Sequence, residues 1–205
     1  DLEAIRSYAG KVDSAAVLGG GLLGLEAARS LLDCGLKTHV IQLSSGLMPQ
    51  QLDLAAAAVL KQQVEKAGVE VHLEKKTTAI KADGEQRVLA FSDGSTLNAG
   101  MVVISTGVRA RDELASAAGI ACSPGGGVLV NDGLQTSVPY VYAIGECARH
   151  NGDHYGLVAP GYRMAEVLAE RLCGEASIFR GAERSTRLKV LGIEVVTLGE
   201  FLPEP

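Results

Sequence analysis

The sequence lacks the marks of nucleic-acid-binding and membrane proteins. It carries a formal net charge of −5 and one adjacent basic pair, Lys75-Lys76, whereas a general nucleic-acid binder carries a basic stripe. The longest uncharged run, residues 114–131, contains Pro124 and three consecutive glycines, so it cannot form a membrane helix of about 20 apolar residues. We therefore expect neither nucleic acid nor a membrane as a partner.

Cysteine and aromatic residues are also scarce. The four cysteines lie far apart and form no CxxC, which excludes a zinc ribbon and an adjacent redox pair. We expect reduced thiols and a cytoplasmic location. Tryptophan is absent and phenylalanine occurs three times, whereas glycine occurs 25 times, which indicates many tight turns. A hydrophobic content of 47% with 21% charged residues excludes a disordered chain.

The first 107 residues have the pattern of an α/β domain. Short apolar runs alternate with helical segments that end at glycine, which predicts a βαβαβ unit with a parallel sheet and right-handed crossovers. The expected strands are residues 15–18, 38–43, 69–73 and 101–104, and the expected helices are residues 22–34 and 51–67. Two Asp-Gly pairs predict hairpins that join residues 77–81, 87–91 and 96–97 into a three-stranded antiparallel meander.

A second block begins at Val108. Its expected elements are a helix at residues 112–118, a strand at 128–130, a buried strand over Tyr140–Ile144 and a helix at 161–173 after Pro160. The tail, residues 187–200, alternates like one or two strands. We therefore divide the chain of 205 residues into segments 1–107, 108–184 and 185–205, and expect it to be a piece of a longer protein.

A glycine-rich loop follows the first expected strand and opens the first expected helix. Its residues Gly19, Gly20, Gly21, Leu22, Leu23 and Gly24 fit GxGxxG, in the βαβ context that makes this motif a dinucleotide fingerprint. Gly19 permits the tight turn, Gly21 lets the backbone approach a pyrophosphate, and Gly24 lets helix and strand pack closely. The helix N-terminus would attract the phosphates.

Two polar residues are candidates for other parts of the dinucleotide. Gln42 falls where the adenosine ribose is usually recognised; it favours NAD over NADP but leaves NADP open, because an amide does not repel a phosphate. Glu26 follows Gly24 by two residues. Its spacing leaves two interpretations open, a first-turn acid that complements the helix dipole or a residue directed towards the nicotinamide.

The four histidines do not suggest a reactive or metal-binding group by their spacing. We interpret His39 and His72 as structural because they lie in expected strands, and no partner spacing makes His150 or His154 a metal ligand. No catalytic residue and no metal site are therefore assigned.

Several further motifs resemble those of the FAD- and NAD(P)H-dependent pyridine nucleotide oxidoreductases. Val17–Glu26 resembles their NADH fingerprint, Thr106-Gly107 their domain-crossing turn, and Thr136–Cys147 their second FAD motif. Gly-Glu-Cys stands where most members have Gly-Asp. This variant, the following Tyr155–Tyr162 and the tail 185–192 resemble most closely the nitrite reductase large subunits. The resemblance covers nearly the whole chain.

The resemblance implies roles for individual residues. Glu26 would contact the nicotinamide amide, and Gly107 and Val108 would lie near the nicotinamide. Glu146, after Gly145, would accept a hydrogen bond from a flavin ribityl hydroxyl, although it is one methylene longer than the usual aspartate. The helix that begins at Ala159-Pro160 would direct its N-terminus to the flavin.

The implied protein is a flavoenzyme that passes hydride from NADH to FAD and then electrons to a siroheme and iron–sulfur centre elsewhere in the parent protein. The implied fold is a Rossmann-like parallel sheet with the meander, plus the C-terminal half of an FAD-binding domain, because a first FAD fingerprint has no counterpart here. Alternatives are a rubredoxin or ferredoxin reductase or an NADH oxidase, a nucleotide-binding module without turnover, and an assembly role in which the tail 187–200 forms a homodimer strand.

Overall fold

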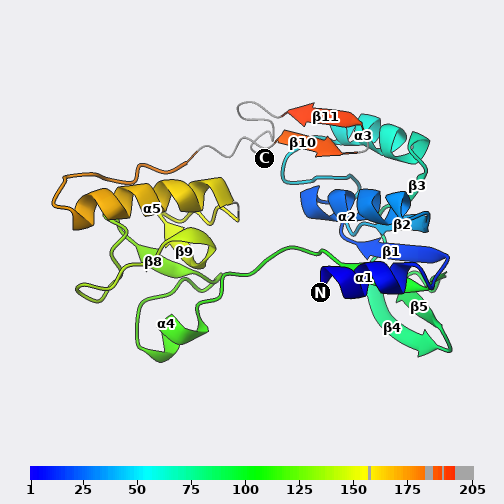
Figure 1. Cartoon of the computed structure of the whole chain (residues 1–205), viewed down its shortest axis with the longest axis horizontal. Coiled ribbons are helices and arrows are strands. Elements are labelled where there is room, and N and C mark those ends of the chain that lie inside the picture. The colour runs from blue at the N-terminus through cyan, green and yellow to red at the C-terminus, as the bar shows by residue number, and fades with distance from the viewer. Residues whose placement is uncertain (157, 183–186, 191, 197–205) are drawn as a thin grey trace. The chain divides into compact units, whose positions relative to one another are not determined.

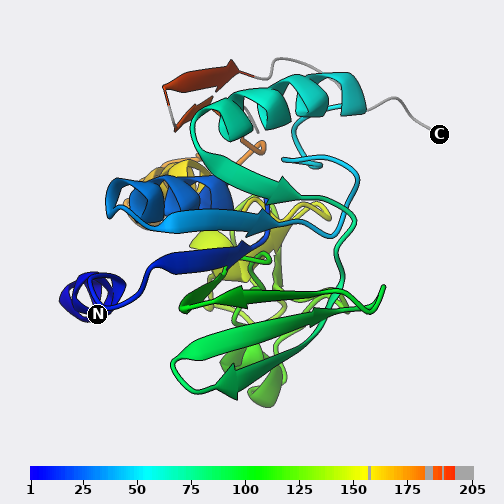
Figure 2. The same ribbon diagram turned by 90° about the vertical axis from the view of Figure 1, so that its right-hand side faces the viewer.

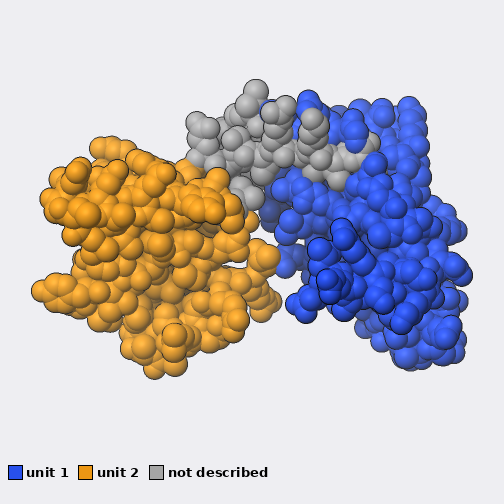
Figure 3. All heavy atoms as spheres, viewed as in Figure 1, with its two compact units in different colours: residues 1–107, 185–205 blue, residues 108–184 orange. Residues whose placement is uncertain are grey.

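The computed structural model describes residues 1–156, 158–182, 187–190 and 192–196. The chain forms two compact units, residues 1–107 with residues 185–205 and residues 108–184, which Figure 3 colours separately. Each unit combines helices with strands (Figure 1), so the predicted α/β class is confirmed. No helix in the described part of the chain is long and apolar enough to cross a membrane.

A four-stranded parallel sheet forms the centre of the first unit. Its strands are β1 (Ser14–Leu18), β2 (Lys37–Ile41), β3 (Val69–His72) and β7 (Met101–Ile104), in the order β3-β2-β1-β7. Every neighbouring pair is parallel, as the βαβαβ pattern predicts. Four of the five residues of β1 are buried, because helices cover one face of the sheet and a second sheet covers the other (Figure 2).

Two helices cover one face of the parallel sheet. From α2 (Leu22–Asp33) and α3 (Leu54–Lys66), Leu25 and Leu60 pack against Val17 and Val40 of the strands. Helix α3 begins three residues after the predicted start because the Asp53 side chain accepts a 2.8 Å hydrogen bond from the N–H of Ala56 and caps the helix there. An additional helix, α1 (Leu2–Ala9), precedes β1.

The predicted antiparallel meander covers the other face. It consists of β4 (Thr77–Asp83), β5 (Gln86–Phe91) and β6 (Thr96–Ala99), with β5 in the middle. Both predicted Asp-Gly turns are present, with φ of +56° at Gly84 and +82° at Gly94. Leu89 and Phe91 form a core with Leu18 and Ile41 of the parallel sheet.

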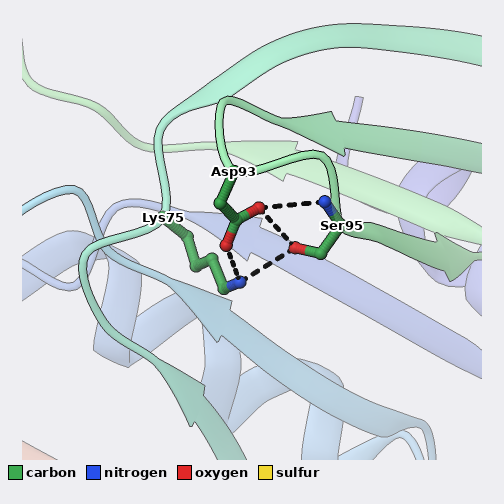
Figure 4. A network of polar contacts seen from close by, with 3 residues as sticks. All are labelled: Lys75, Asp93 and Ser95. Carbon is green, nitrogen blue, oxygen red and sulfur yellow. Dashed lines mark hydrogen bonds and ion pairs between the residues drawn. The ribbon is translucent and has the colours of Figure 1, made fainter.

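A small polar network ties the turn between β5 and β6 to the loop that follows β3. The Lys75 ammonium pairs with the Asp93 carboxylate and donates a 2.8 Å bond to the Ser95 hydroxyl, while the Ser95 hydroxyl and N–H both donate to Asp93 (Figure 4). The bond from Lys75, followed by those from Ser95, holds the pKa of Asp93 well below its usual range. Lys75 also lies 5.4 Å from the centre of the Phe91 ring.

This network predicts an acid-sensitive contribution to stability. Because the pKa of Asp93 is lower in the folded chain than in the unfolded chain, its contribution is complete above the unfolded value of about 4 and is lost as the pH falls through the folded value. We expect Asp93→Asn to lower the urea midpoint of unfolding at pH 7 and to lower it by a smaller amount at pH 3, where the contribution is only partly lost. Urea titrations followed by circular dichroism at both pH values measure this; an equal loss at both would contradict it.

The second unit is built around a short parallel pair of strands and one long helix. It contains α4 (Glu113–Ala117), β8 (Val128–Val130), the single 3₁₀ turn η1 (Gly145–Cys147), β9 (Ala148–His150) and α5 (Val158–Leu172). Strand β8 pairs with β9 in parallel. The buried core of this unit includes Val130, Met164, Val167 and Phe179.

Two expectations for this unit are wrong. Tyr140–Ile144 is not a strand: Tyr140 has φ +63° and is 90% exposed, and within this segment a single bridge joins Tyr142 to Gln135. An apolar run becomes a strand only where a neighbouring strand accepts its backbone hydrogen bonds. Helix α5 begins at Val158 rather than after Pro160. Pro160 is tolerated in the first turn because N–H groups there have no helical partner.

The tail forms the hairpin β10 (Arg187–Val190) and β11 (Ile193–Val196), which agrees with the predicted pair of strands. Ile193 and Val195 pack against the hydrophobic core of the first unit. The rest of the predicted segment, residues 185–186, 191 and 197–205, lies outside the described residues.

Candidate functional site

The glycine-rich loop forms a tight turn between β1 and α2, at the carboxyl ends of the parallel strands. Gly19 has a φ of +109°, a backbone conformation that residues other than glycine rarely adopt. Its N–H donates a 2.8 Å hydrogen bond to the carbonyl of Ile41. A Cβ on Gly19 would lie 2.0 Å from the carbonyl oxygen of Ser105, just beyond β7. The loop therefore packs directly against the carboxyl end of β2 and against the residue that follows β7.

Gly20 and Gly24 are also closely packed. A Cβ on Gly24 would lie 1.9 Å from the carbonyl oxygen of Gly19, and a Cβ on Gly20 would lie 2.5 Å from a methyl carbon of Leu47. These distances are far below any van der Waals contact. Close packing of helix and strand thus requires glycine at position 24, as the sequence pattern predicts.

Gly21 differs from the other three glycines because nothing lies near it. A Cβ at this position would have no atom within 4 Å, and its φ of −82° is accessible to any residue. Gly21 is the N-cap of α2, where no side chain caps the helix and the first turn contains no acidic residue. The positive end of the helix is consequently left uncompensated and open to a ligand.

Gln42 connects the glycine loop to the loop after β2. Its side-chain oxygen accepts a 2.9 Å bond from the N–H of Gly20, and its amide nitrogen donates to the hydroxyl of Ser44 at 2.6 Å and to the carbonyl of Gly46 at 3.3 Å. The residue is only 8% exposed. Gln42 therefore orders both loops, and contact with a ribose would require it to exchange one of these bonds.

Glu26 lies just beyond the first turn of α2, whose start at Leu22 agrees with the predicted helix. Because α2 begins at Leu22, directly after Gly21, Glu26 opens the second turn and is not a first-turn acid. Its side chain is exposed, and its backbone carbonyl accepts a bond from the Ser30 hydroxyl. The interpretation as a dipole-complementing acid in the first turn is therefore wrong.

A second group of predicted residues meets within residues 108–184. Gly145, with φ +80°, opens η1 and donates its N–H to the sulfur of Met164 at 3.3 Å. A Cβ on Gly161 would lie 3.3 Å from the Cα of Gly145, so η1 sits directly against the first turn of α5. Glu146 and Ala159 are exposed, whereas Pro160 is buried. The structure thus brings the Gly-Glu pair beside a helix N-terminus.

The remaining predicted residues and histidines occupy defined positions. Gly107 and Val108 stand at the boundary between the units, where Gly107 has φ +108° and Val108 is 57% exposed. The buried ring of His150 lies 2.8 Å from a carboxylate oxygen of Asp132, and that hydrogen bond lowers the pKa of Asp132. His154 bonds the backbone carbonyl of Glu146 at 2.8 Å.

Comparison with known proteins gives consistent results. A family model described as pyridine nucleotide-disulphide oxidoreductase matches residues 1–166. The nitrite reductase (NADH) large subunit of Escherichia coli (strain K12) is 46% identical and the NAD(P)H nitrite reductase of Bacillus subtilis (strain 168) 44% identical, each over 98% of this chain. The crystal structure of an FAD-dependent pyridine nucleotide-disulphide oxidoreductase from Desulfovibrio vulgaris superposes with a TM-score of 0.82 at 29% identity, covering 92% of this chain and 50% of that one.

The relatives are much longer than this chain. It covers 24% of the Escherichia coli protein and 25% of the Bacillus subtilis protein, so it spans about a quarter of the length of the relatives it matches.

Proposed function

The chain belongs to the pyridine nucleotide-disulphide oxidoreductase family, and from that premise we propose that residues 1–107 bind NADH and residues 108–184 contribute the second half of an FAD site. The observation that carries the proposal is the contrast within the glycine loop. Gly19 and Gly24 are required by close backbone contacts, whereas Gly21 is required by nothing in the chain and stands at an uncapped helix end. A glycine that the fold does not need indicates that a ligand needs the space.

The NADH site fits a dinucleotide on several grounds. The pyrophosphate would lie over Gly21, where backbone N–H groups and the helix dipole favour negative charge. Gln42 holds Gly20 in place from the loop after β2 and lies on the adenosine side. Glu26, exposed one turn along α2, would contact the nicotinamide amide, and Gly107 and Val108 would border the nicotinamide.

The FAD half-site fits on the geometry of η1 and α5. The absence of a Cβ at Gly161 allows Gly145 to approach the first turn of α5, so that the exposed Glu146 and Ala159 border one helix end. Glu146 would accept a hydrogen bond from a ribityl hydroxyl, and the N-terminus of α5 would stabilise negative charge on the reduced flavin.

The chemistry requires positioning rather than a reactive side chain. The residues at Gly21 and Glu26 would hold NADH and those at Gly145 and Glu146 would hold part of FAD, and the bound pair would supply hydride-transfer chemistry. Hydride transfer between two bound cofactors would need no acid or base from this chain, whose residues would position them. We further propose that the electrons serve nitrite reduction at a siroheme and iron–sulfur centre elsewhere in a longer protein, on the strength of the two relatives.

Titration with NADH and NADPH, side by side by calorimetry, tests the nucleotide site. We expect NADH to bind with one site per chain and more tightly than NADPH, because the described residues of the loop after β2 offer no arginine for a 2′-phosphate. Tighter binding of NADPH would overturn the assignment of the ribose side. Absence of binding by both would overturn the nucleotide site in this chain.

Flavin content distinguishes turnover from simple binding. A purified chain that retains FAD and bleaches when NADH is added supports the oxidoreductase. A colourless chain that still binds NADH supports instead a nucleotide-binding module without turnover, an alternative motivated by the single GxGxxG motif in the sequence.

A further inference from the structure

Three metal-ligand side chains converge at the edge of the parallel sheet, apart from the glycine loop. In the register of β2 and β3, His39 is opposite Glu70 and Ile41 is opposite His72. Alternation along the strands places His39, Glu70 and His72 on the face that carries Ile41, which is the meander side. Among the described residues, this is the only group of three such side chains whose ligand atoms lie within 4.8 Å of one another.

The distances match those of a tetrahedral metal site. The Nδ1 atom of His39 lies 3.2 Å from Nε2 of His72 and 3.2 Å from a carboxylate oxygen of Glu70. Nitrogen and oxygen ligands at about 2.1 Å from a tetrahedral zinc ion lie roughly 3.4 Å from one another. Both separations from His39 are close to this value, and all three ligand atoms lie within 4.8 Å of one another.

Hydrogen bonding alone satisfies this arrangement poorly. Nδ1 of His39 faces two groups that can accept a hydrogen bond, the ring nitrogen of His72 and the carboxylate of Glu70, but it carries at most one proton. If the proton lies instead on His72, then the lone pair of His39 faces the carboxylate. A cation at the centre would satisfy all three lone pairs at once.

We propose that His39, Glu70 and His72 bind one Zn²⁺ ion, with water as the fourth ligand. The side chain of His39 is 5% exposed and that of Glu70 is 51% exposed, so the site is anchored in the core and open to solvent on one side. An open hollow of about 460 Å³ borders Glu70 and His72. The ion would join β2 to the edge strand β3.

The surroundings are compatible with a cation. Lys37 lies 3.0 Å from Oε1 of Glu70, which fixes the orientation of the carboxylate. The other oxygen, Oε2, faces His39 and is the one that would bind the metal. Lys75 and Glu65 are the other charged groups that act on His72, with opposite signs. Burial lowers the pKa of both His39 and His72, which keeps the rings in the neutral form that binds metals.

Zinc titration of the chelator-treated, full chain tests the proposal. We expect one Zn²⁺ per chain by calorimetry, a rise in the thermal midpoint on adding Zn²⁺, and the visible absorption of a tetrahedral complex when Co²⁺ replaces it. His72→Ala should weaken zinc binding at least about 100-fold and abolish the thermal shift, and Glu70→Gln should weaken binding at least about 10-fold. Glu70 is exposed, so this variant remains folded even if His72→Ala does not.

Two matched variants separate a built site from general affinity for metal ions. Glu65→Gln removes a carboxylate that lines the same hollow and pairs with Lys61, and His154→Ala removes a histidine from the other unit. Both should retain wild-type zinc affinity and the Co²⁺ spectrum. The proposal is overturned if zinc does not bind, or if Glu70→Gln and Glu65→Gln bind it equally well.

Discussion

Gly24→Ala is expected to destabilise the first unit by about 3 kcal/mol or more. The added Cβ would lie 1.9 Å from the carbonyl oxygen of Gly19, and neither atom belongs to a flexible side chain. Relief would require α2 to move away from β1, which would separate Leu25 from Val17 in the buried core. Thermal unfolding followed by circular dichroism measures the loss as a lower midpoint for the transition of this unit.

Gly10→Ala is the matched control for this substitution. Gly10 is also in the first unit, has a helical φ of −69°, and would place its Cβ 3.7 Å from the nearest carbonyl oxygen. This variant should unfold at the wild-type temperature or slightly above it, because alanine reduces the freedom of the unfolded chain. A wild-type midpoint for Gly24→Ala would show that helix and strand are not packed as the structure has them.

Gly21→Val is expected to lower the affinity for NADH at least about 100-fold, or nearly 3 kcal/mol, while leaving the stability nearly unchanged. The space beyond Gly21 is open, so the side chain meets no atom of the protein, but it would occupy the position proposed for the pyrophosphate. Calorimetric titration with NADH measures the affinity, and thermal unfolding without ligand measures the stability.

The pair of variants at positions 21 and 24 separates the two uses of glycine in one loop. Gly24→Ala should lower the stability and should lower NADH affinity only as a consequence. Gly21→Val should lower NADH affinity alone. Unchanged NADH affinity in Gly21→Val would remove the principal support for the nucleotide site, whatever the family of the chain. A large loss of stability in that variant would contradict the open space around Gly21.

Local sequence patterns were sufficient for much of this architecture. The apolar runs predicted the strands β1, β2, β3 and β7, and the Asp-Gly pairs predicted the meander, because both signals act through neighbours in the chain. The glycine pattern likewise predicted a turn in the left-handed region at Gly19 and the close approach at Gly24. The motifs around Gly145 identified the family that the comparisons show.

Other predictions failed where the outcome depends on distant partners or on one capping bond. Tyr140–Ile144 is apolar enough for a strand, but its segment forms a single bridge, to Gln135, within the described residues. Helix α3 starts three residues later than predicted because the Asp53 side chain caps it.

The sequence by itself determined the order of the elements, the parallel βαβ unit and the identity of the glycine loop, since each follows from local spacing and backbone freedom. Only the tertiary structure decided that the side-chain amide of Gln42 forms hydrogen bonds with Gly20, Ser44 and Gly46. It also decided that the side chain of His39 lies close to those of Glu70 and His72. Gln42 is 22 residues from Gly20 in the chain, and His39 is 33 residues from His72. Their meeting depends on the register of neighbouring strands, which a short sequence window does not contain.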